Sequence, residues 1–141
     1  MTFLKVENLS KTYVQSKTVQ TEALKDVNLE IHQGDFIVIN GPSGSGKTTL
    51  LNLIGGLDEP TAGKVFLEDQ EISALKEKEL AEIRLKSMGF IFQAYNLIPV
   101  LTAMENIEYI EMLQGVSKEE RRENARKVAA HLEIEDLLDK R

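Results

Sequence analysis

The apolar positions in the first half of the chain predict three β-strands, and the alternation of apolar and polar residues over residues 23–31 indicates a half-buried one. The first strand runs from Phe3 towards Tyr13. The others span residues 23–31 and 64–67, and a polar turn at residues 15–18 separates the first two.

Two other apolar runs contain β-branched or aromatic residues without alternation, and they predict buried strands. Residues 36–39 read Phe-Ile-Val-Ile and lead into a glycine-rich loop. Residues 88–92 form the second run, which ends at Gln93.

Helical spacing predicts two helices in the first part of the chain. Residues 49–54 form a helix that Gly55 and Gly56 end. Residues 76–86 form an amphipathic helix whose inward side chains are Leu80, Ile83 and the alanine between them, Ala81.

Helices dominate after Gln93. Two capping boxes, Thr102 to Glu105 and Ser117 to Glu120, each begin a helix, and Gly115 ends the first. A third, short helix is expected from residue 135. The sequence thus predicts an α/β region over residues 1–93 and a helical region over residues 94–141. The second capped helix has a narrow apolar stripe formed by Ala125, Val128, Ala129 and Leu132.

Residues 41–48 fit the pattern G-x-x-x-x-G-K-[ST] of a phosphate-binding loop. The strand before it and the helix after it supply the context that this loop needs. Glycines let backbone N–H groups approach phosphate oxygens at the positive end of the helix dipole. A glycine-rich turn with a surface lysine is the alternative, and the flanking elements disfavour it. The predicted nucleotide site contains Gly41, Pro42, Ser43, Gly44, Ser45, Gly46, Lys47, Thr48 and Thr49.

Two side chains of this loop have distinct expected roles. Lys47 would place a positive charge on the β- and γ-phosphates, and the Thr48 hydroxyl would ligate Mg²⁺. Hydrogen bonds to charged groups contribute about 1.5–3 kcal/mol, so loss of Lys47 is expected to weaken binding at least about tenfold.

Composition narrows the classes of function. With 141 residues, 42% hydrophobic and 28% charged, the chain is typical of one globular domain. A net charge of −6 argues against a nucleic-acid surface. The absence of cysteine excludes disulfides and thiolate metal sites, and His32 and His131 are expected at the surface. The start of the chain lacks a secretory h-region, which predicts a cytoplasmic location.

The chain resembles the N-terminal portion of an ATP-binding subunit of an ABC transporter, in the branch that serves lipoprotein-releasing, macrolide-export and antimicrobial-peptide-export systems. The resemblance covers the whole chain and implies an α/β P-loop NTPase fold of the ABC type, followed by the start of a helical subdomain. It rests on residues 9–13 (Leu-Ser-Lys-Thr-Tyr), 23–27, the phosphate loop, 52–58, and above all 89–99 and 101–106.

The resemblance implies ATP and Mg²⁺ as ligands and gives roles to two further residues. Tyr13 resembles the aromatic residue that stacks on adenine, although an ordinary strand aromatic would look the same. Gln93 resembles the glutamine that reaches Mg²⁺ and the attacking water, so Thr48 and Gln93 are the expected metal ligands. The intact protein is expected to form a homodimer with a second ATP-binding subunit when ATP binds.

The segment from Tyr95 to Leu113 resembles the docking site of the transmembrane permease subunit, which would hold the protein at the inner face of the membrane. The wide apolar belt of its helix also suits a helix whose apolar side chains all fill the core, and the pattern alone leaves both readings open. The belt consists of Met104, Ile107, Tyr109, Ile110, Met112 and Leu113.

Several family elements do not occur in these residues. They are the Leu-Ser-Gly-Gly-Gln signature, the aspartate–glutamate pair after an apolar strand, and the switch histidine. We therefore expect the 141 residues to bind nucleotide weakly or not at all and not to hydrolyse it, whereas the intact family member would be an ATPase. Residues 36–39 are also expected to have unpaired edges and an uncovered apolar face, with marginal stability, self-association or a rearranged structure as the result.

Two other classes of protein are alternatives to an ABC transporter subunit. A GTPase needs Asn-Lys-x-Asp and Asp-x-x-Gly motifs, which do not occur here, and a small kinase needs an arginine-rich lid, which Arg121 and Arg122 in a surface helix do not supply. A non-catalytic module that binds nucleotide or a transporter partner shares every motif above and differs only in turnover.

Overall fold

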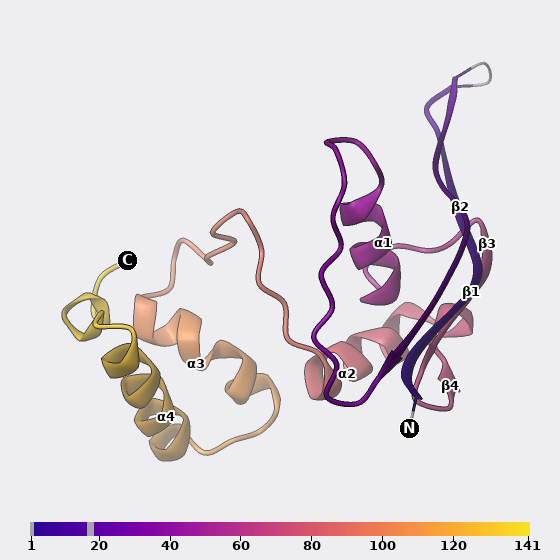
Figure 1. Ribbon diagram of the computed structural model, residues 1–141. Helices are drawn as coiled ribbons and strands as arrows, with labels where there is room; N and C mark the ends of the chain where they lie inside the picture. The colour runs from indigo at the N-terminus through magenta and orange to yellow at the C-terminus, as the bar shows by residue number, and fades with distance from the viewer. Residues whose placement is uncertain (1, 17–18) are drawn as a thin grey trace. The chain divides into compact units, whose positions relative to one another are not determined.

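The computed structural model describes residues 2–16 and 19–141. It divides into two compact units, Met1–Arg84 and Leu85–Arg141 (Figure 1). This division falls earlier in the chain than the predicted change of character after Gln93, and that boundary stays a prediction. Lys17 and Thr18 of the predicted polar turn lie outside the described residues.

The first unit contains a four-stranded antiparallel sheet with the order β2-β1-β3-β4. Its strands are β1 (Thr2–Val14), β2 (Gln20–His32), β3 (Ala62–Leu67) and β4 (Gln70–Glu71). The three strands that the apolar positions predicted are confirmed, with longer bounds. Val6 lies at the centre of the sheet, because it pairs with Leu29 on one side and Val65 on the other.

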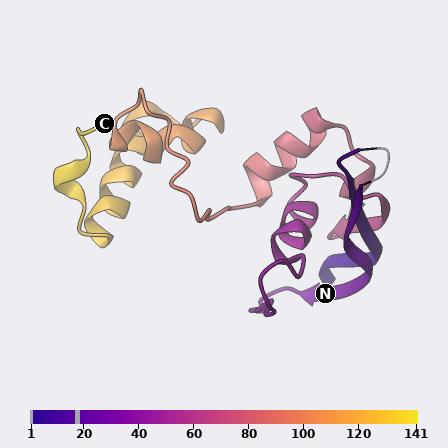
Figure 2. The same cartoon turned by 90° about the horizontal axis from the view of Figure 1, so that it is seen from above.

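Two helices and a short 3₁₀ turn complete this unit, and α1 lies beside one face of the sheet in Figures 1 and 2. They are α1 (Lys47–Ile54), which Gly55 caps, η1 (Ile72–Ala74) and α2 (Glu77–Ser87). Leu80 of α2 is buried and Ile83 is partly buried as predicted, but Ala81 is exposed. The apolar core of the unit consists of Leu4, Val6, Leu9, Leu24, Leu50, Leu53, Val65, Ile72 and Leu80.

The second unit is helical, with α3 (Ala103–Leu113), α4 (Lys118–His131) and the 3₁₀ turn η2 (Glu135–Leu137). The capping box of Thr102 and Glu105 is confirmed in both of its hydrogen bonds. At the second one, the Ser117 hydroxyl accepts from the Glu120 backbone N–H. The core consists of Met104, Ala125, Ala129 and Leu138, with Ile107 and Ile134 packed against it.

The predicted apolar stripe of α4 is only half correct. Ala125 and Ala129 are buried, whereas Val128 and Leu132 are exposed. The reason is that α3 and η2 cover a narrow face of α4, for which two small residues are sufficient.

The two strands predicted from uninterrupted apolar runs are absent. Residues 36–39 and 88–92 belong to no strand, and Phe36 is 91% and Ile91 103% exposed. A strand exists only where a neighbour accepts and donates its backbone hydrogen bonds, and the described residues contain no neighbour for either run. The expected uncovered apolar face at residues 36–39 is thereby confirmed, since Val38 is also 73% exposed.

Candidate nucleotide-binding site

The lysine of the glycine-rich loop folds back onto the loop itself. Lys47 Nζ donates to the carbonyl oxygen of Gly41 at 2.9 Å and to that of Pro42 at 2.8 Å. It also lies 3.4 Å from Ser45 Oγ. The Lys47 ammonium group thus binds carbonyl oxygens of residues five and six positions before it. The loop therefore curves around this positive charge.

The helix that follows the loop has a free N-terminus. Gly46 is the N-cap residue of α1, it supplies no side-chain cap, and the first turn contains no acidic residue. Among the described residues, the backbone N–H groups of Lys47 and Thr48 have no hydrogen-bond acceptor. These donors and the helix dipole favour an anion at this place.

Gly46 also fixes where the loop lies on the sheet. Its φ is +86°, a conformation that favours glycine, and a Cβ built there would lie 2.5 Å from the Ala23 carbonyl oxygen and 2.9 Å from Leu24 Cδ2. The loop therefore passes directly over β2, with no space for a side chain between them.

The donor set of the loop fits a magnesium–triphosphate ligand. Thr48, on the first turn of α1, is exposed and carries a hydroxyl oxygen, which is a ligand type that Mg²⁺ accepts. No group of three or more His, Cys, Asp or Glu that could hold a metal exists within residues 2–16 and 19–141. Mg²⁺ commonly binds through one or two protein groups plus substrate phosphates. Gln93 belongs to the other unit, and its role in this site stays a prediction.

Tyr13 lies in a small polar cluster at the end of β1. Its hydroxyl donates to Asp58 Oδ2 at 2.8 Å, and Lys11 Nζ donates to Asp58 Oδ1 at 2.7 Å. The Lys11 ammonium also lies 4.9 Å from the centre of the Tyr13 ring. Burial alone would raise the pKa of Asp58, but the hydrogen bonds from Lys11, Tyr13 and the Glu59 backbone outweigh it and lower that pKa below its ordinary value.

Asp58 and Lys11, which contact Tyr13, were not singled out by any motif in the sequence. Both lie in segments that carry the family resemblance, residues 9–13 and 52–58, but no spacing in the sequence connects them. Their contact follows from the irregular pairing of β1, whose register shifts near Lys11, and from the turn after α1.

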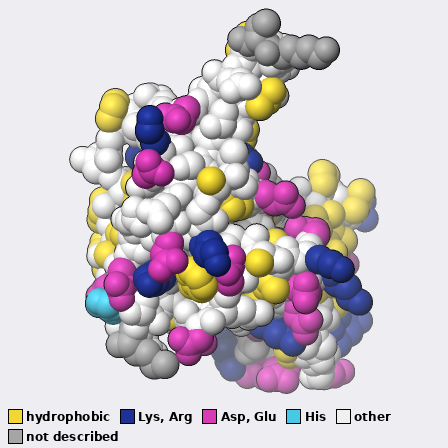
Figure 3. Space-filling view, turned by 90° about the vertical axis from the view of Figure 1, so that its right-hand side faces the viewer, with side chains coloured by type: hydrophobic (Ala, Val, Ile, Leu, Met, Phe, Trp, Pro, Cys, Tyr) yellow, Lys and Arg dark blue, Asp and Glu magenta, His cyan; other side chains and the backbone are white. Residues whose placement is uncertain are grey.

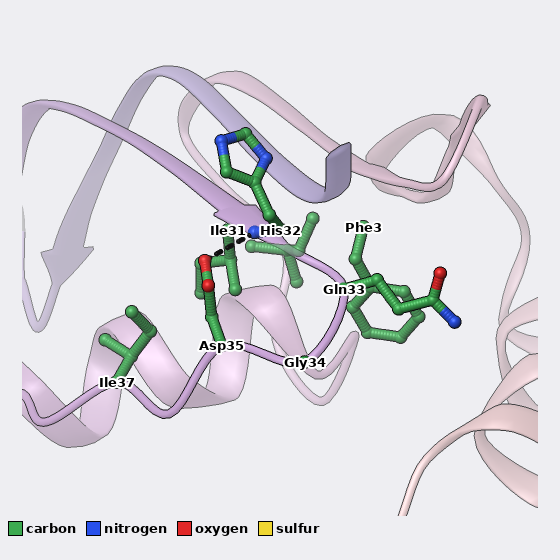
Figure 4. A pocket seen from close by; sticks show the side chains of 8 residues that line it. Phe3, Ile31, His32, Gln33, Gly34, Asp35 and Ile37 are labelled. Atoms are coloured by element: carbon green, nitrogen blue, oxygen red, sulfur yellow. Dashed lines mark hydrogen bonds between the residues drawn. The ribbon is translucent and has the colours of Figure 1, made fainter. Parts of the chain in front are cut away.

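A separate apolar pocket of about 320 Å³ lies where β1 begins and β2 ends (Figure 4). The backbone N–H of His32 donates to Asp35 Oδ2 at 2.8 Å across the turn that forms its rim. None of its lining residues belongs to the phosphate loop, so we do not assign it to the nucleotide site. They are Phe3, Leu4, Ile31, His32, Gln33, Gly34, Asp35 and Ile37.

In the helical unit, the apolar belt of α3 divides between core and surface. Met104 is buried and Ile107 packs on the core, whereas Ile110, Met112 and Leu113 are exposed. The reading in which all of these side chains fill the core is therefore wrong, because one side of the belt faces outward. Docking of a partner on that side stays a prediction. In the segment before α3, Tyr95, Leu97 and Val100 are exposed as well.

Asn106 is a further residue to which no sequence motif gave a role. Its side chain accepts from the Ile98 backbone N–H at 2.8 Å, and it donates to the carbonyl oxygens of Ile98 and Thr102. One amide thus fastens the segment before α3 to the first turn of that helix.

Charge on the surface is mixed. On the face drawn in Figure 3, Lys and Arg side chains lie beside Asp and Glu side chains. Lys5 pairs with Glu7 at 2.6 Å, and Lys64 pairs with Glu71 at 3.0 Å. Among the helices of the described ranges, none combines the length and the apolar character that crossing a bilayer requires.

Two solved structures to which the chain is similar are ATP-binding cassettes. The chain superimposes with a TM-score of 0.90 and 43% identity on the dimeric, post-hydrolysis ATP-binding cassette MJ0796 bound to ADP and Pi, over 96% of this chain and 60% of that one. A second dimeric structure of the same bacterial ABC transporter cassette gives a TM-score of 0.88. The fold is thus that of an ABC-type nucleotide-binding domain, as the sequence predicted.

The family model for ABC transporters matches residues 24–141, and the chain belongs to this family. It is 44% identical over 136 residues to an ABC transporter ATP-binding protein of Methanocaldococcus jannaschii, across 94% of this chain and 57% of that protein. It is 41% identical over 138 residues to the macrolide export ATP-binding/permease protein MacB of Brucella abortus, across 98% of this chain and 21% of that protein. The chain therefore spans little more than half of the first relative and about a fifth of the second.

Proposed function

We propose that residues 41–49 bind the phosphates of Mg²⁺–ATP, and that the protein is an ATP-binding subunit that couples ATP to export through a membrane partner. The observation that carries this proposal is the uncapped N-terminus of α1 beside the ammonium group of Lys47. A helix N-terminus with free N–H groups and an adjacent lysine is suited to a polyanion. The ADP and Pi in the neighbouring cassette structure support the same class of ligand.

The residues of the proposed site have different roles. Lys47 exchanges its carbonyl partners for phosphate oxygens, and backbone N–H groups of residues 43–48 donate to the same phosphates. Tyr13 stacks on the base, and Thr48 and Gln93 hold the metal. Bound Mg²⁺ would neutralise part of the phosphate charge.

The exposed apolar residues of the helical unit support a partner surface between Tyr95 and Leu113. MacB combines an ATP-binding part with a permease part, as its name states. We propose that a permease docks on this segment at the inner face of the membrane, and that two ATP-binding subunits pair in the intact protein, as the cassette in the neighbouring structure does.

We also propose that these residues alone do not turn ATP over. In the family, hydrolysis needs the signature of a second subunit and a carboxylate that orients water, and neither motif occurs in this sequence. A steady-state phosphate-release assay on the 141-residue chain is expected to show no turnover. Turnover that disappears in Lys47→Ala would contradict this part of the proposal.

Calorimetric titration with Mg²⁺–ATP tests the binding site itself. Lys47→Ala should weaken ATP binding at least about tenfold, because a charged donor to phosphate is lost. Lys78→Ala is the matched control, since Lys78 is an exposed lysine of α2 and should leave the affinity unchanged. Equal affinities for the Lys47 variant and the original chain would refute the proposed site.

A further inference from the structure

Both oxygens of the Asp58 carboxylate are engaged in the cluster at the end of β1. Oδ1 accepts from Lys11 Nζ and from the Glu59 backbone N–H at 2.8 Å, and Oδ2 accepts from the Tyr13 hydroxyl. The Lys11 side chain is only 12% exposed, so the pair is partly shielded from water. A shielded, charge-assisted cluster of this kind is stronger than an exposed ion pair.

The cluster holds the Tyr13 ring at two points. The hydroxyl is tied to Asp58, and the Lys11 ammonium lies over one face of the ring. Because a tyrosine side chain has two rotatable bonds before its ring, two contacts of this kind select one orientation. The residue nevertheless stays 37% exposed, so the ring remains open to a ligand.

This ring lies close to the phosphate loop. A Cβ at Gly46 would meet the backbone of Ala23 and the side chain of Leu24, and Leu24 pairs with Lys11. Tyr13 follows two residues later on the same strand, about 7 Å along it. A base attached to phosphates in the loop would therefore meet the tyrosine ring on this part of the sheet.

We propose that Asp58 and Lys11 are positioning residues for nucleotide binding, which orient the Tyr13 ring so that its face away from Lys11 receives the base. This inference rests on the proposed function. Asp58 and Lys11 act through the tyrosine and touch no phosphate. Their contribution comes from preorganisation, since a ring already fixed loses little freedom when a base stacks on it.

The test compares a ligand that has a base with one that has none. Mg²⁺–ATP and Mg²⁺–tripolyphosphate are titrated calorimetrically into the 141-residue chain, its Asp58→Asn and Tyr13→Phe variants, and the double variant. Each single variant is expected to bind ATP about 2- to 10-fold more weakly, the range that one hydrogen bond supplies. Tripolyphosphate affinity should stay unchanged, and the double variant should bind ATP no more weakly than Asp58→Asn alone.

Asp69→Asn is the matched control, because Asp69 is an exposed aspartate in the turn between β3 and β4 of the same unit. It should change neither affinity. Tyr13→Phe removes a single oxygen and leaves the pair of Lys11 and Asp58 in place, so it tests the inference even if Asp58→Asn impairs folding.

The possible results separate this inference from the proposed function. Unchanged ATP affinity in Tyr13→Phe, or an equal loss of ATP and tripolyphosphate affinity in the variants, would overturn the positioning role while the phosphate site stands. Failure of the original chain to bind either ligand would overturn the proposed function and this inference together.

Discussion

Among the glycines of the phosphate loop, Gly46 leaves the least space for a side chain, because β2 lies directly against it. Gly46→Ala would place a methyl group 2.5 Å from the Ala23 carbonyl oxygen, in a backbone conformation that alanine adopts at a cost of about 1–2 kcal/mol. We expect the variant to lower the free energy of unfolding by at least about 1 kcal/mol and to weaken ATP binding.

Urea unfolding followed by circular dichroism measures the first effect, and calorimetry measures the second. Gly89→Ala is the control, since a Cβ at Gly89 meets nothing within 4 Å. A Gly46→Ala variant as stable as the Gly89→Ala variant would show that the loop can move away from the strand.

The hydrogen bonds to Asp58 predict how stability depends on pH. Its pKa in the folded chain lies below its ordinary value of 3.8. The unfolded chain therefore takes up a proton first as the pH falls, so the carboxylate stabilises the fold above that value and this contribution is lost through the lower, folded pKa. Free energies of unfolding measured between about pH 5 and pH 2 should fall less steeply for Asp58→Asn than for the original chain. Identical slopes would mean that the carboxylate gains nothing from Lys11 and Tyr13 on folding.

Residue types and spacing were enough to predict the phosphate loop, but not the surroundings of Tyr13. The loop is a contiguous pattern in which each residue has a recognisable role. Asp58 meets Tyr13 only because strand register and the turn after α1 bring together residues 45 positions apart. No local rule relates those positions, so the sequence offered a role for the aromatic ring and none for the groups that hold it.

At the level of secondary structure, sequence reasoning succeeded where an element completes its hydrogen bonds locally. β1 and β2 are consecutive strands that pair with each other, and α3 begins with the predicted capping box. Two segments are as apolar as buried strands, namely residues 36–39 and 88–92. An apolar sequence alone does not supply the neighbouring strand with which they would pair. Their state depends on strands from elsewhere, which a periodicity argument does not take into account.

The capping box at the start of α3 can be tested directly. Thr102 Oγ1 accepts from the Glu105 N–H, and the Glu105 carboxylate accepts from the Thr102 N–H. Thr102→Ala should destabilise the helical unit by about 1 kcal/mol, because the Glu105 backbone N–H, a partly buried donor, loses its partner. Thr102→Ser keeps the oxygen and should cost far less. Amide hydrogen exchange in α3 reports the difference, and equal protection in the two variants would show that the cap contributes nothing.

At the scale of the whole molecule, the apolar run at residues 36–39 departs from a closed fold, because Phe36 and Val38 are largely exposed. An exposed, extended segment with free backbone groups can pair with another chain. We predict concentration-dependent association without nucleotide, measurable by sedimentation velocity. Val38→Lys should reduce it, because a charge on such a segment opposes pairing. Val14→Lys, at a similarly exposed valine of β1, is the control. A monomer at all concentrations, or equal effects of the two lysines, would contradict this prediction.

The attachment of Lys47 to its own loop has a consequence for ligand discrimination. An incoming anion must replace two carbonyl oxygens, those of Gly41 and Pro42, as hydrogen-bond partners of the Lys47 ammonium group. A singly charged anion has little electrostatic advantage over such neutral competitors, whereas a triphosphate has several charges with which to displace them. The loop is therefore expected to favour multiply charged anions over singly charged ones such as chloride.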